Sequence, residues 1–290
     1  MFKKVITLEK VKELYLERAL IQCAKGTYDC YDKHLTKIID FLNSIKIKKT
    51  DQIGRENINA FILNERKINK KNVTINKRVE SLKQALKYCK ELDYISKNNL
   101  EYWRNLPKEP HETKIIDIEN LKKILKHVEE KETIRNKALI FLLLTTGIRR
   151  SELLNLKAQN FDFEKGLLTL TKTKTNKIRR IPLEERTIIF LSDHLKDCKD
   201  IFIFNLVPNS INAIFYKIKK NLGLASKLSL SPHKWRHTYA TMCLENGSNL
   251  EFIRNTLGHS NLTTTQKYLH LSTKALQSEH ARVNPLANLT

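Results

Sequence analysis

Apolar residues recur at helical spacing through most of the first hundred residues. A repeat of three to four positions places such side chains on one face of a helix, and each stretch here is short. Several short helices with one apolar face each predict a small helical bundle. The expected helices are residues 8–25, residues 28–42, one around Ile58, Phe61 and Ile62, and one that begins after the capping residue Thr74 and reaches Cys89.

A break in this pattern divides the chain. Residues 107–113 contain Pro107 and Pro110 among charged neighbours. Prolines at this spacing disfavour helix and stiffen an extended connector. We therefore expect a helical domain over residues 1–106, a linker over 107–113 and a second domain over 114–290.

The second part mixes two periods. Helical patterns cover Ile118 to about Glu130 and Ile134 to Thr145, and helices are again expected after Leu183. Between them the period changes to that of strands with polar turns. The fold class is therefore mainly α with a small antiparallel β-sheet, an α+β second domain. The predicted strands are Phe161–Phe163, Leu167–Leu170 and Arg179–Pro182, joined by turns at Glu164–Gly166 and Thr175–Lys177.

The charge of the chain indicates a partner. Lys and Arg number 53 against 31 Asp and Glu, a formal net charge of +22. Residues 1–113 hold 24 basic minus 15 acidic residues, or +9, and residues 114–290 hold 29 minus 16, or +13. This favours a polyanion, and its presence in both parts predicts two domains that clamp double-stranded DNA. A lysine bias of the whole proteome is the alternative.

Basic side chains of the first part are candidate DNA contacts because they lie on polar helix faces and connections. A solvated face is the other explanation of such a run. The candidates are Lys46, Lys48, Lys49, Lys70, Lys71, Lys77, Arg78 and Lys83.

Composition excludes several classes of protein. An apolar fraction of 41% supports folded cores. The longest apolar run, Ala138–Leu144, is far below the ~20 residues that span a bilayer, and the N-terminal residues lack the apolar region of a signal peptide. The five cysteines contain no CxxC pair, so neither a disulfide framework nor a zinc knuckle is expected. We expect a cytoplasmic protein with no membrane partner.

Two turns of the second part carry cations. Arg149 follows Thr-Gly-Ile, between a helix that ends at Gly147 and one that begins at Ser151, and the start of a helix favours an anion. Lys174 lies in the polar tip between two predicted strands, where its ammonium can reach a phosphodiester. Either residue alone is also compatible with an ordinary surface position.

Two further motifs contain His and Tyr. In the segment SPHKWRHT, His233 and Arg236 at i and i+3 point the same way from a helix that Ser-Pro begins. Zinc ligation by His233 and His237 is the alternative, but the Glu of HExxH is missing and no third ligand is suitably placed. His259 follows Leu-Gly, and Tyr268 comes nine residues later. A phenol with a pKa near ~10 needs cationic neighbours to act as a nucleophile.

The order and spacing of these motifs resemble those of the tyrosine recombinases, the phage-integrase family that includes the Xer proteins and Cre. The matching blocks are TGIR followed by SELL, KTNK between strands, HKWRH, LGH and the later tyrosine. They cover about residues 114–275, and the first part is similar to the family's SAM-like core-binding domain. The length before the linker predicts a minimal two-domain form, without the arm-binding module of integrases that resemble the lambda enzyme.

The resemblance implies a site-specific recombinase that works through a 3′-phosphotyrosine intermediate and a Holliday junction. Arg149 and Arg236 match the arginines that hold the phosphate, and Tyr268 matches the nucleophile. His233 would assist Tyr268, and Lys174 would protonate the 5′ leaving oxygen. Because the cations are side chains, no metal, ATP or other cofactor is implied. The implied catalytic set is Arg149, Lys174, His233, Arg236, His259 and Tyr268.

The sequence departs from the family pattern at two places. Trp235 stands where Leu is common, which predicts a change of packing. Thr173 and Thr175 replace hairpin glycines and predict a stiffer hairpin, in which Lys172 is the alternative to Lys174 as the acid.

Two other functional classes share part of these features. A type IB topoisomerase uses the same chemistry but does not exchange strands, and a non-catalytic DNA-binding regulator has no use for Arg149, Arg236 and Tyr268 at these spacings. The small helical domain and short linker favour the recombinase. The implied partner is DNA with an inverted-repeat core site; the accessory proteins are unknown. Resolution of dimers or cointegrates and integration of a DNA element are all compatible with the sequence.

The C-terminal residues predict self-association. After Tyr268, residues 271–290 carry an apolar stripe at Ala275, Leu276 and Val283 that is too sparse for a stable isolated helix. In the resembling family the equivalent helix packs into the neighbouring protomer, which closes a tetramer on two DNA sites. The alternative is a tail that folds back on its own domain.

Overall fold

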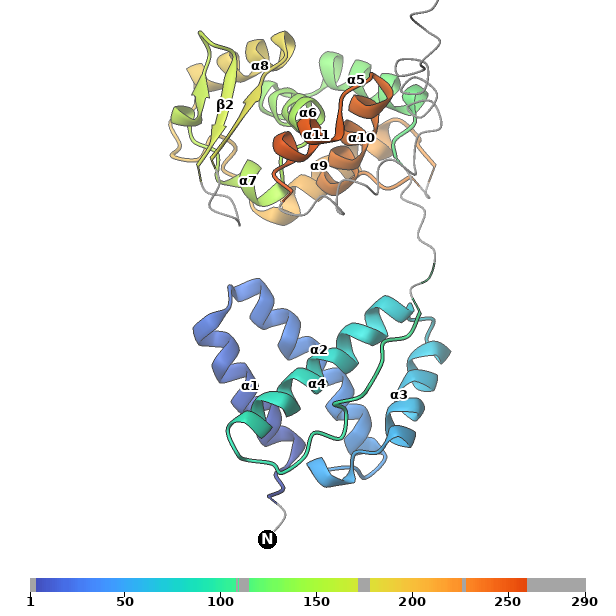
Figure 1. The fold of residues 1–290 in the computed structure, drawn as a ribbon. Coiled ribbons are helices and arrows are strands. Elements are labelled where there is room, and N and C mark those ends of the chain that lie inside the picture. The colour runs from blue at the N-terminus through green and yellow to red at the C-terminus, as the bar shows by residue number, and fades with distance from the viewer. Residues whose placement is uncertain (1–3, 108, 110–114, 172–177, 226–227, 260–290) are drawn as a thin grey trace, which may run out of the picture. The chain divides into compact units, whose positions relative to one another are not determined.

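The computed structural model describes residues 4–107, 109, 115–171, 178–225 and 228–259. The chain forms two compact units, Met1–His111 and Glu112–Thr290 (Figure 1). The expected fold class is confirmed, because the described residues are mainly helical and contain one small antiparallel sheet.

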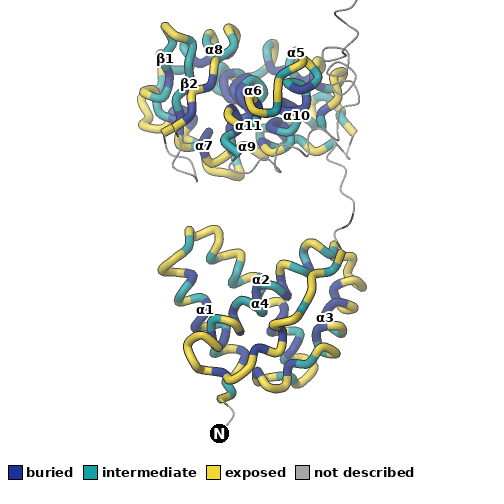
Figure 2. The backbone as a smooth tube through the Cα atoms, viewed as in Figure 1, coloured by how far each residue is buried: buried dark blue, intermediate teal, exposed yellow. Residues whose placement is uncertain are grey.

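The first unit is a helical bundle. Its helices bury one apolar face each, so that Leu35, Phe61 and Leu82 are shielded from solvent in a shared core (Figure 2). The helices α1, α2 and α4 pack against one another, and α3 packs on α2 and α4. The elements are α1 (Leu8–Gln22), α2 (Lys25–Ser44), η1 (Thr50–Gln52), α3 (Arg55–Lys67) and α4 (Asn72–Glu91).

Two helix boundaries differ from the sequence prediction. The break between α1 and α2 falls at Cys23 and Ala24, so Gly26 lies in the first turn of α2 instead of ending α1. Helix α4 begins at Asn72, and the predicted capping residue Thr74 lies inside its first turn. A distant residue explains the earlier start, because the carboxylate of Glu109 accepts a hydrogen bond from the backbone N–H of Asn72 at 3.1 Å.

The chain after α4 returns along that helix (Figure 1). Asn76 fixes it by two hydrogen bonds, since its side chain donates to the carbonyl of Leu106 at 2.9 Å and accepts from the Leu106 N–H at 2.8 Å. Lys83 Nζ donates to the carbonyl of Trp103 at 3.1 Å. Together with a hydrogen bond from Nδ2 of Asn72 to the carbonyl of Pro107 at 3.0 Å, these bonds hold the segment leading to Pro107 against α4.

The second unit surrounds an apolar helix, α6, with further helices and a sheet. Strands β1, β2 and β3 are antiparallel in that order, with Leu168 opposite both Phe161 and Ile181. The elements are α5 (Ile118–Lys131), α6 (Ile134–Thr146), α7 (Arg150–Leu154), η2 (Ala158–Asn160), β1 (Phe161–Asp162), β2 (Leu167–Leu170), β3 (Arg179–Pro182), α8 (Glu185–Lys196), α9 (Pro208–Asn221), α10 (Pro232–Glu245) and α11 (Leu250–Leu257).

Helix α6 positions the site because it forms the centre of this unit. Its residues from Ala138 to Leu143 are all buried, and it packs against both α8 and α10 (Figure 2). Trp235 on α10 is fully buried and stacks on Phe215 with ring centroids 5.8 Å apart. The tryptophan therefore acts in packing and fixes its helix against the core.

Three general properties bear on the expected classes of protein. Among the described residues, no helix is long and apolar enough to cross a membrane. The five cysteines are free thiols. Within the same described ranges, no group of three or more His, Cys, Asp or Glu side chains is arranged to hold a metal ion.

Candidate active site

Arg149 lies in the turn between α6 and α7. Gly147 ends α6 in the left-handed conformation, with φ of 57°, and Arg149 is the N-cap of α7. The Glu152 carboxylate accepts both from the Arg149 backbone N–H and from its Nη1, each at 2.9 Å. Nη2 of Arg149 donates to the carbonyl of Gly258 at 2.6 Å. The backbone turn and these bonds fix the direction of a half-buried guanidinium.

Arg236 joins the ends of two helices. It projects from α10, which Ser231 caps by accepting a hydrogen bond from the Lys234 N–H. Its Nη1 donates to the carbonyl of Gly147 and its Nη2 to that of Leu257, both at 2.7 Å. Carbonyls at helix C-termini carry partial negative charge, which favours a cation. Arg236 is 5% exposed, so its position is set by the ends of α6 and α11.

Two glycines allow the helix ends to approach. A Cβ atom on Gly147 would lie 2.6 Å from side-chain atoms of both Leu257 and Tyr239. Gly258, with φ of 65°, ends α11, and a Cβ there would lie 2.4 Å from Nη1 of Arg179. Since these positions need a left-handed backbone and no side chain, the Thr-Gly-Ile and Leu-Gly-His motifs have a common structural reason.

Glu152 and Arg179 belong to the site although the sequence pattern gave them no role. Nη1 and Nη2 of Arg179, on β3, donate to the two Glu152 oxygens at 2.9 and 2.7 Å. Burial alone would raise the pKa of Glu152, but the hydrogen bonds and charges of Arg179 and Arg149 hold that pKa below its ordinary value. The sequence contained only a weak signal of this role for Glu152, because a Glu three residues after an N-cap is typical of any capped helix start.

His259 follows Gly258 directly and lies close to the same three arginines. Burial, and then the charges of Arg236, Arg149 and Arg179, lower the pKa of His259 to about 4. The imidazole is therefore neutral at ordinary pH. It can donate one hydrogen bond to a phosphate oxygen without adding a further charge.

His233 and His237 form a pair on α10. Their Nε2 atoms lie 2.7 Å apart, so one ring donates and the other accepts. Burial, followed by the charges of Arg236 and Lys234, lowers the pKa of His233. No third His, Cys, Asp or Glu is grouped with this pair among the described residues.

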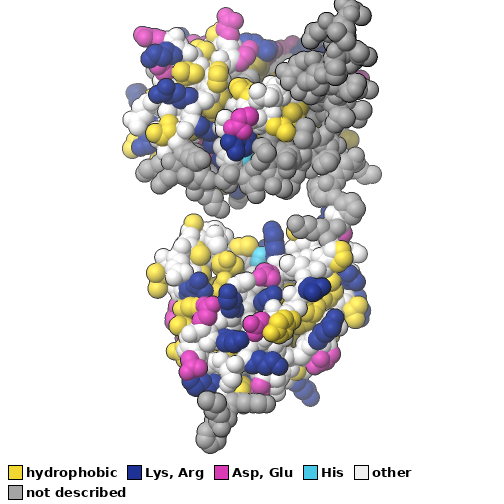
Figure 3. Space-filling view, in the orientation of Figure 1, with side chains coloured by type: hydrophobic (Ala, Val, Ile, Leu, Met, Phe, Trp, Pro, Cys, Tyr) yellow, Lys and Arg dark blue, Asp and Glu magenta, His cyan; other side chains and the backbone are white. Residues whose placement is uncertain are grey.

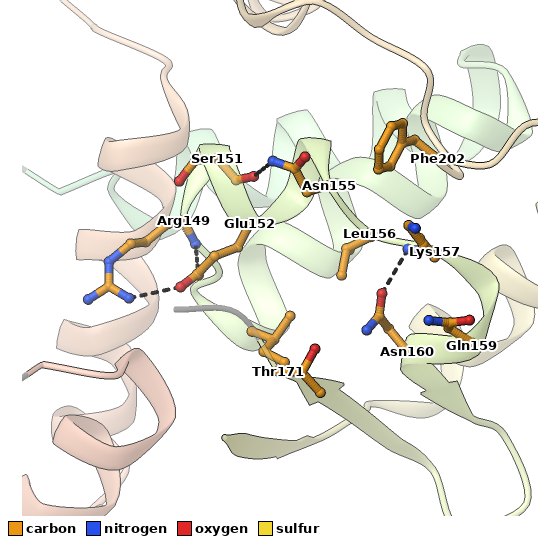
Figure 4. Close-up of a pocket in the computed structure, with 11 residues that line it drawn as sticks. Arg149, Ser151, Glu152, Asn155, Leu156, Lys157, Gln159, Asn160, Thr171 and Phe202 are labelled. Carbon is orange, nitrogen blue, oxygen red and sulfur yellow. Dashed lines mark hydrogen bonds and ion pairs between the residues drawn. The ribbon is translucent and has the colours of Figure 1, made fainter. Parts of the chain in front are cut away.

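A cavity of about 660 Å³ opens beside Arg149. Figure 4 shows Arg149 at one end and Lys157 with Phe202 at the other. Most of the side chains that line it are polar, and apart from Phe202 they come from the region of α7 and η2 and from the end of β2. The lining residues are Arg149, Ser151, Glu152, Asn155, Leu156, Lys157, Gln159, Asn160, Leu170, Thr171 and Phe202.

The structure brings part of the predicted catalytic set together. Arg149, Arg236 and His259 meet where α6, α10 and α11 converge. Lys174, its rival Lys172 and Tyr268 lie outside the described residues. Tyr239 on α10 is the alternative nucleophile, but it is buried against Gly147 and burial raises the pKa of its phenol. It is therefore poorly suited to attack a phosphate.

The candidate DNA contacts of the first unit are not equivalent. The sequence predicted Arg78 as an exposed DNA contact, and this prediction is wrong. Arg78 is buried on α4 and paired with the buried carboxylate of Glu65, so it does not lie on a solvated face. Lys83 is partly buried and bonded to the carbonyl of Trp103. On the face shown in Figure 3, basic side chains of this unit are scattered among acidic ones. The exposed candidates are Lys46, Lys48, Lys49, Lys70, Lys71 and Lys77.

Comparison with protein families places the chain. Residues 114–275 match the phage integrase family, and these residues contain every element of the site described above. The chain belongs to the phage integrase family.

Individual relatives narrow the kind of protein. The chain is 34% identical to the tyrosine recombinase XerA of Pyrococcus furiosus over 182 residues, which are 59% of this chain and 62% of that protein. It is 26% identical to the tyrosine recombinase XerD of Oceanobacillus iheyensis over 94% of this chain and 96% of that one. The protein is a site-specific tyrosine recombinase of the Xer-like kind, and neither a topoisomerase nor a non-catalytic regulator is favoured.

Solved structures agree on the fold. A structure of the Tn1549 transposon integrase in complex with a circular intermediate DNA has a TM-score of 0.74 at 21% identity, covering 94% of this chain and 99% of that one. A lambda integrase tetramer bound to a Holliday junction has a TM-score of 0.74 at 18% identity, covering 89% and 79%. At such identities these similarities concern the fold alone.

Proposed function

We propose that this recombinase cleaves DNA by attack of the Tyr268 phenol oxygen on a backbone phosphate. A bond forms between that oxygen and phosphorus, and the bond from phosphorus to the 5′ oxygen breaks. Lys174 gives a proton to the leaving 5′ oxygen, while His233 accepts the phenol proton. One diester replaces another, so rejoining to a second strand needs no ATP.

The paired arginines are the observation that carries this proposal. In phosphoryl transfer, negative charge spreads over the non-bridging oxygens, and catalysis depends on cations already in place. Arg149 and Arg236 are fixed by carbonyls at the ends of α6 and α11, beside a neutral His259. Forked donors that never deprotonate are suited to two phosphate oxygens.

The test of this proposal is a covalent adduct. DNA trapped on the protein in its native host is sequenced to recover the site, and a nicked duplex with that site is then incubated with purified protein. Tyr268→Phe should abolish the adduct, because it removes one oxygen, and should leave DNA binding nearly unchanged. Tyr239→Phe is the matched control and should retain the adduct. An adduct that survives Tyr268→Phe but not Tyr239→Phe would overturn the assignment.

The sequence of the DNA trapped on the protein in its native host also tests the biological role. We propose an inverted-repeat core site in cytoplasmic, nucleoid-associated bacterial DNA, with the domains 1–106 and 114–290 clamping the duplex through their linker. A site at the boundaries of a DNA element would indicate integration. A single site on a chromosome, plasmid or cointegrate would indicate resolution.

We further propose that residues 271–290 dock on a neighbouring protomer and close a tetramer on two DNA sites. A head-to-tail exchange of this kind forms a closed ring, and its connection to Tyr268 allows docking to decide which tyrosines cut. Deletion of residues 274–290 should leave half-site binding by a monomer intact but abolish tetramer assembly and recombinant product. Unchanged recombination, or a loss of monomer folding alone, would contradict the exchange.

A further inference from the structure

Arg179 is a buried cation that the proposed reaction does not use. Its side chain is 7% exposed, and it donates two hydrogen bonds to Glu152, whose side chain is 6% exposed. It stands at the first position of β3, opposite Leu170, directly after the strand connection that contains Lys174. A site for phosphate that already holds Arg149 and Arg236 thus contains a third guanidinium aimed at a carboxylate.

The contacts of Glu152 pose an electrostatic problem. This carboxylate orients Arg149 through the side chain and through the backbone N–H. A carboxylate bonded to one guanidinium also cancels its charge, which would weaken the attraction of Arg149 for a phosphate. Because charges interact strongly in a buried site, a buried Glu152 would greatly weaken the attraction of Arg149 for a phosphate.

Arg179 changes this balance. With Arg149, Glu152 and Arg179 together, two positive charges share one negative charge, and a single positive charge remains. The fork of Arg179 occupies both oxygens of Glu152, and its shorter bond is 2.7 Å long, against 2.9 Å for the bond from Nη1 of Arg149. Gly258 leaves room for this fork, since a Cβ there would lie 2.4 Å from Arg179 Nη1.

We propose that Arg179 is a positioning residue that satisfies Glu152 so that Glu152 orients Arg149 without neutralising it. This proposal rests on the proposed role of Arg149 at the phosphate. It makes β3 part of the same charged unit as the end of α11. Arg179 itself does not touch the reacting atoms.

The first test is a pair of variants on neighbouring residues. Arg180 follows Arg179 on β3 but is exposed, so Arg180→Met removes the same charge without touching Glu152. In single-turnover cleavage of the nicked duplex at saturating protein, Arg179→Met should be slower by about 10²-fold, the loss typical of one electrostatic contact. Arg180→Met should stay within about 3-fold of wild type, and Arg179→Lys, which keeps the charge but loses the fork, should fall between them.

A double variant separates electrostatics from folding. Arg179→Met/Glu152→Gln removes both buried charges, restores the net positive charge and leaves an amide oxygen to orient Arg149. We expect it to cleave at least about 5-fold faster than Arg179→Met alone, because neighbouring charges couple. If Arg179 only stabilised the fold, the double variant would be no faster, and its melting temperature would track its activity.

A neutral substrate gives a second readout. A methylphosphonate at the scissile position removes a negative charge, so the missing positive charge matters less. On this duplex the defect of Arg179→Met relative to wild type should shrink from about 10²-fold to below about 10-fold. An equal defect on both substrates would overturn the proposal. Failure of the proposed function is distinguishable, because wild type would then form no adduct on the unmodified duplex.

Discussion

The two units hold their basic residues in different ways. In Glu112–Thr290, Arg236 and Arg179 are buried and Arg149 is half-buried, and all three are held by backbone carbonyls or by Glu152. In Met1–His111, most of the lysines proposed to contact DNA are exposed, and Lys46, with a positive φ of 65°, stands in a tight turn after α2. Total charge does not distinguish these groups, whereas burial and hydrogen bonding do.

This difference matches two different requirements, catalysis and DNA affinity. A cation that is fixed before the substrate arrives needs no reorganisation during phosphoryl transfer. A cation on a flexible exposed stem attracts the DNA backbone and releases counterions, which supplies affinity without fixed geometry. We therefore propose that the arginines of the second unit carry out the chemistry and that the exposed lysines of the first unit supply affinity.

Changing Arg236 should have the largest effect. Arg236→Lys keeps a charge but cannot donate to the carbonyls of Gly147 and Leu257 together, so the ends of α6 and α11 lose their common partner. We expect cleavage at saturating DNA to fall by about 10³-fold, with affinity for the site changed by less than about 5-fold. Single-turnover cleavage and a binding titration measure both. A cleavage rate within about 5-fold of wild type would contradict the assignment of chemistry to fixed cations.

Arg78 and Lys77 are neighbours on α4 that test the first unit. Arg78→Met leaves the buried Glu65 without its partner and should lower the free energy of unfolding by about 3–5 kcal/mol. Lys77→Met, at an exposed position, should change stability by less than about 0.5 kcal/mol but reduce the salt dependence of DNA binding. Urea unfolding measures the stability of each variant, and salt titrations of DNA binding measure its salt dependence. If Arg78→Met reduced the salt dependence while Lys77→Met lowered stability, Arg78 would be an exposed DNA contact after all.

A pair of glycines isolates the packing that brings the helix ends together. Gly147 and Gly223 have nearly the same φ, 57° and 58°, but a Cβ meets Leu257 and Tyr239 only at Gly147. Alanine at either position costs about 1–2 kcal/mol of backbone strain. Gly147→Ala should cost at least about 2 kcal/mol more than Gly223→Ala in thermal or urea unfolding, because the core must move. Equal costs would show that the helix ends do not need this close approach.

The pH dependence of stability follows from His259. Its pKa of about 4, lowered by burial and by Arg236, Arg149 and Arg179, lies below the ~6.5 of an unfolded histidine. The unfolded chain therefore binds more protons between these values, and this contribution is complete above pH ~6.5 and is lost as pH falls. Wild type should lose about 1–3 kcal/mol more than His259→Gln between pH ~7 and pH ~4.5, allowing for partial exposure. If wild type and His259→Gln lost the same free energy of unfolding between these two pH values, this role of His259 would be contradicted.

Much of the fold was accessible from the sequence. Helix α6 and strand β2 were predicted because their apolar spacing is strong and local. The start of α4 was not, because Glu109, which lies far along the chain, satisfies the N–H of Asn72. Local periodicity contains no information about such a contact.

The site shows a similar division. Arg149 follows Thr-Gly-Ile, and Arg236 lies three residues after His233 on a helix that Ser-Pro begins, so the role of each had a local signal. The bond of Arg179 to Glu152 joins residues 27 positions apart and had none. For Arg78 a signal existed, since it lies between Ile75 and Leu82 on the buried stripe of α4.

The most direct measurement of the central claim is a salt titration of paired variants on the recovered site, with affinity and saturated cleavage rate measured together. Lys48→Gln should lower the salt slope by about 0.9 for each phosphate that the lysine neutralises and leave the saturated cleavage rate unchanged. Arg149→Met should leave the slope within about one unit of wild type and reduce the saturated rate by at least about 10²-fold. If Arg149→Met changed only affinity while Lys48→Gln reduced the saturated rate, the division between fixed and exposed cations would be wrong.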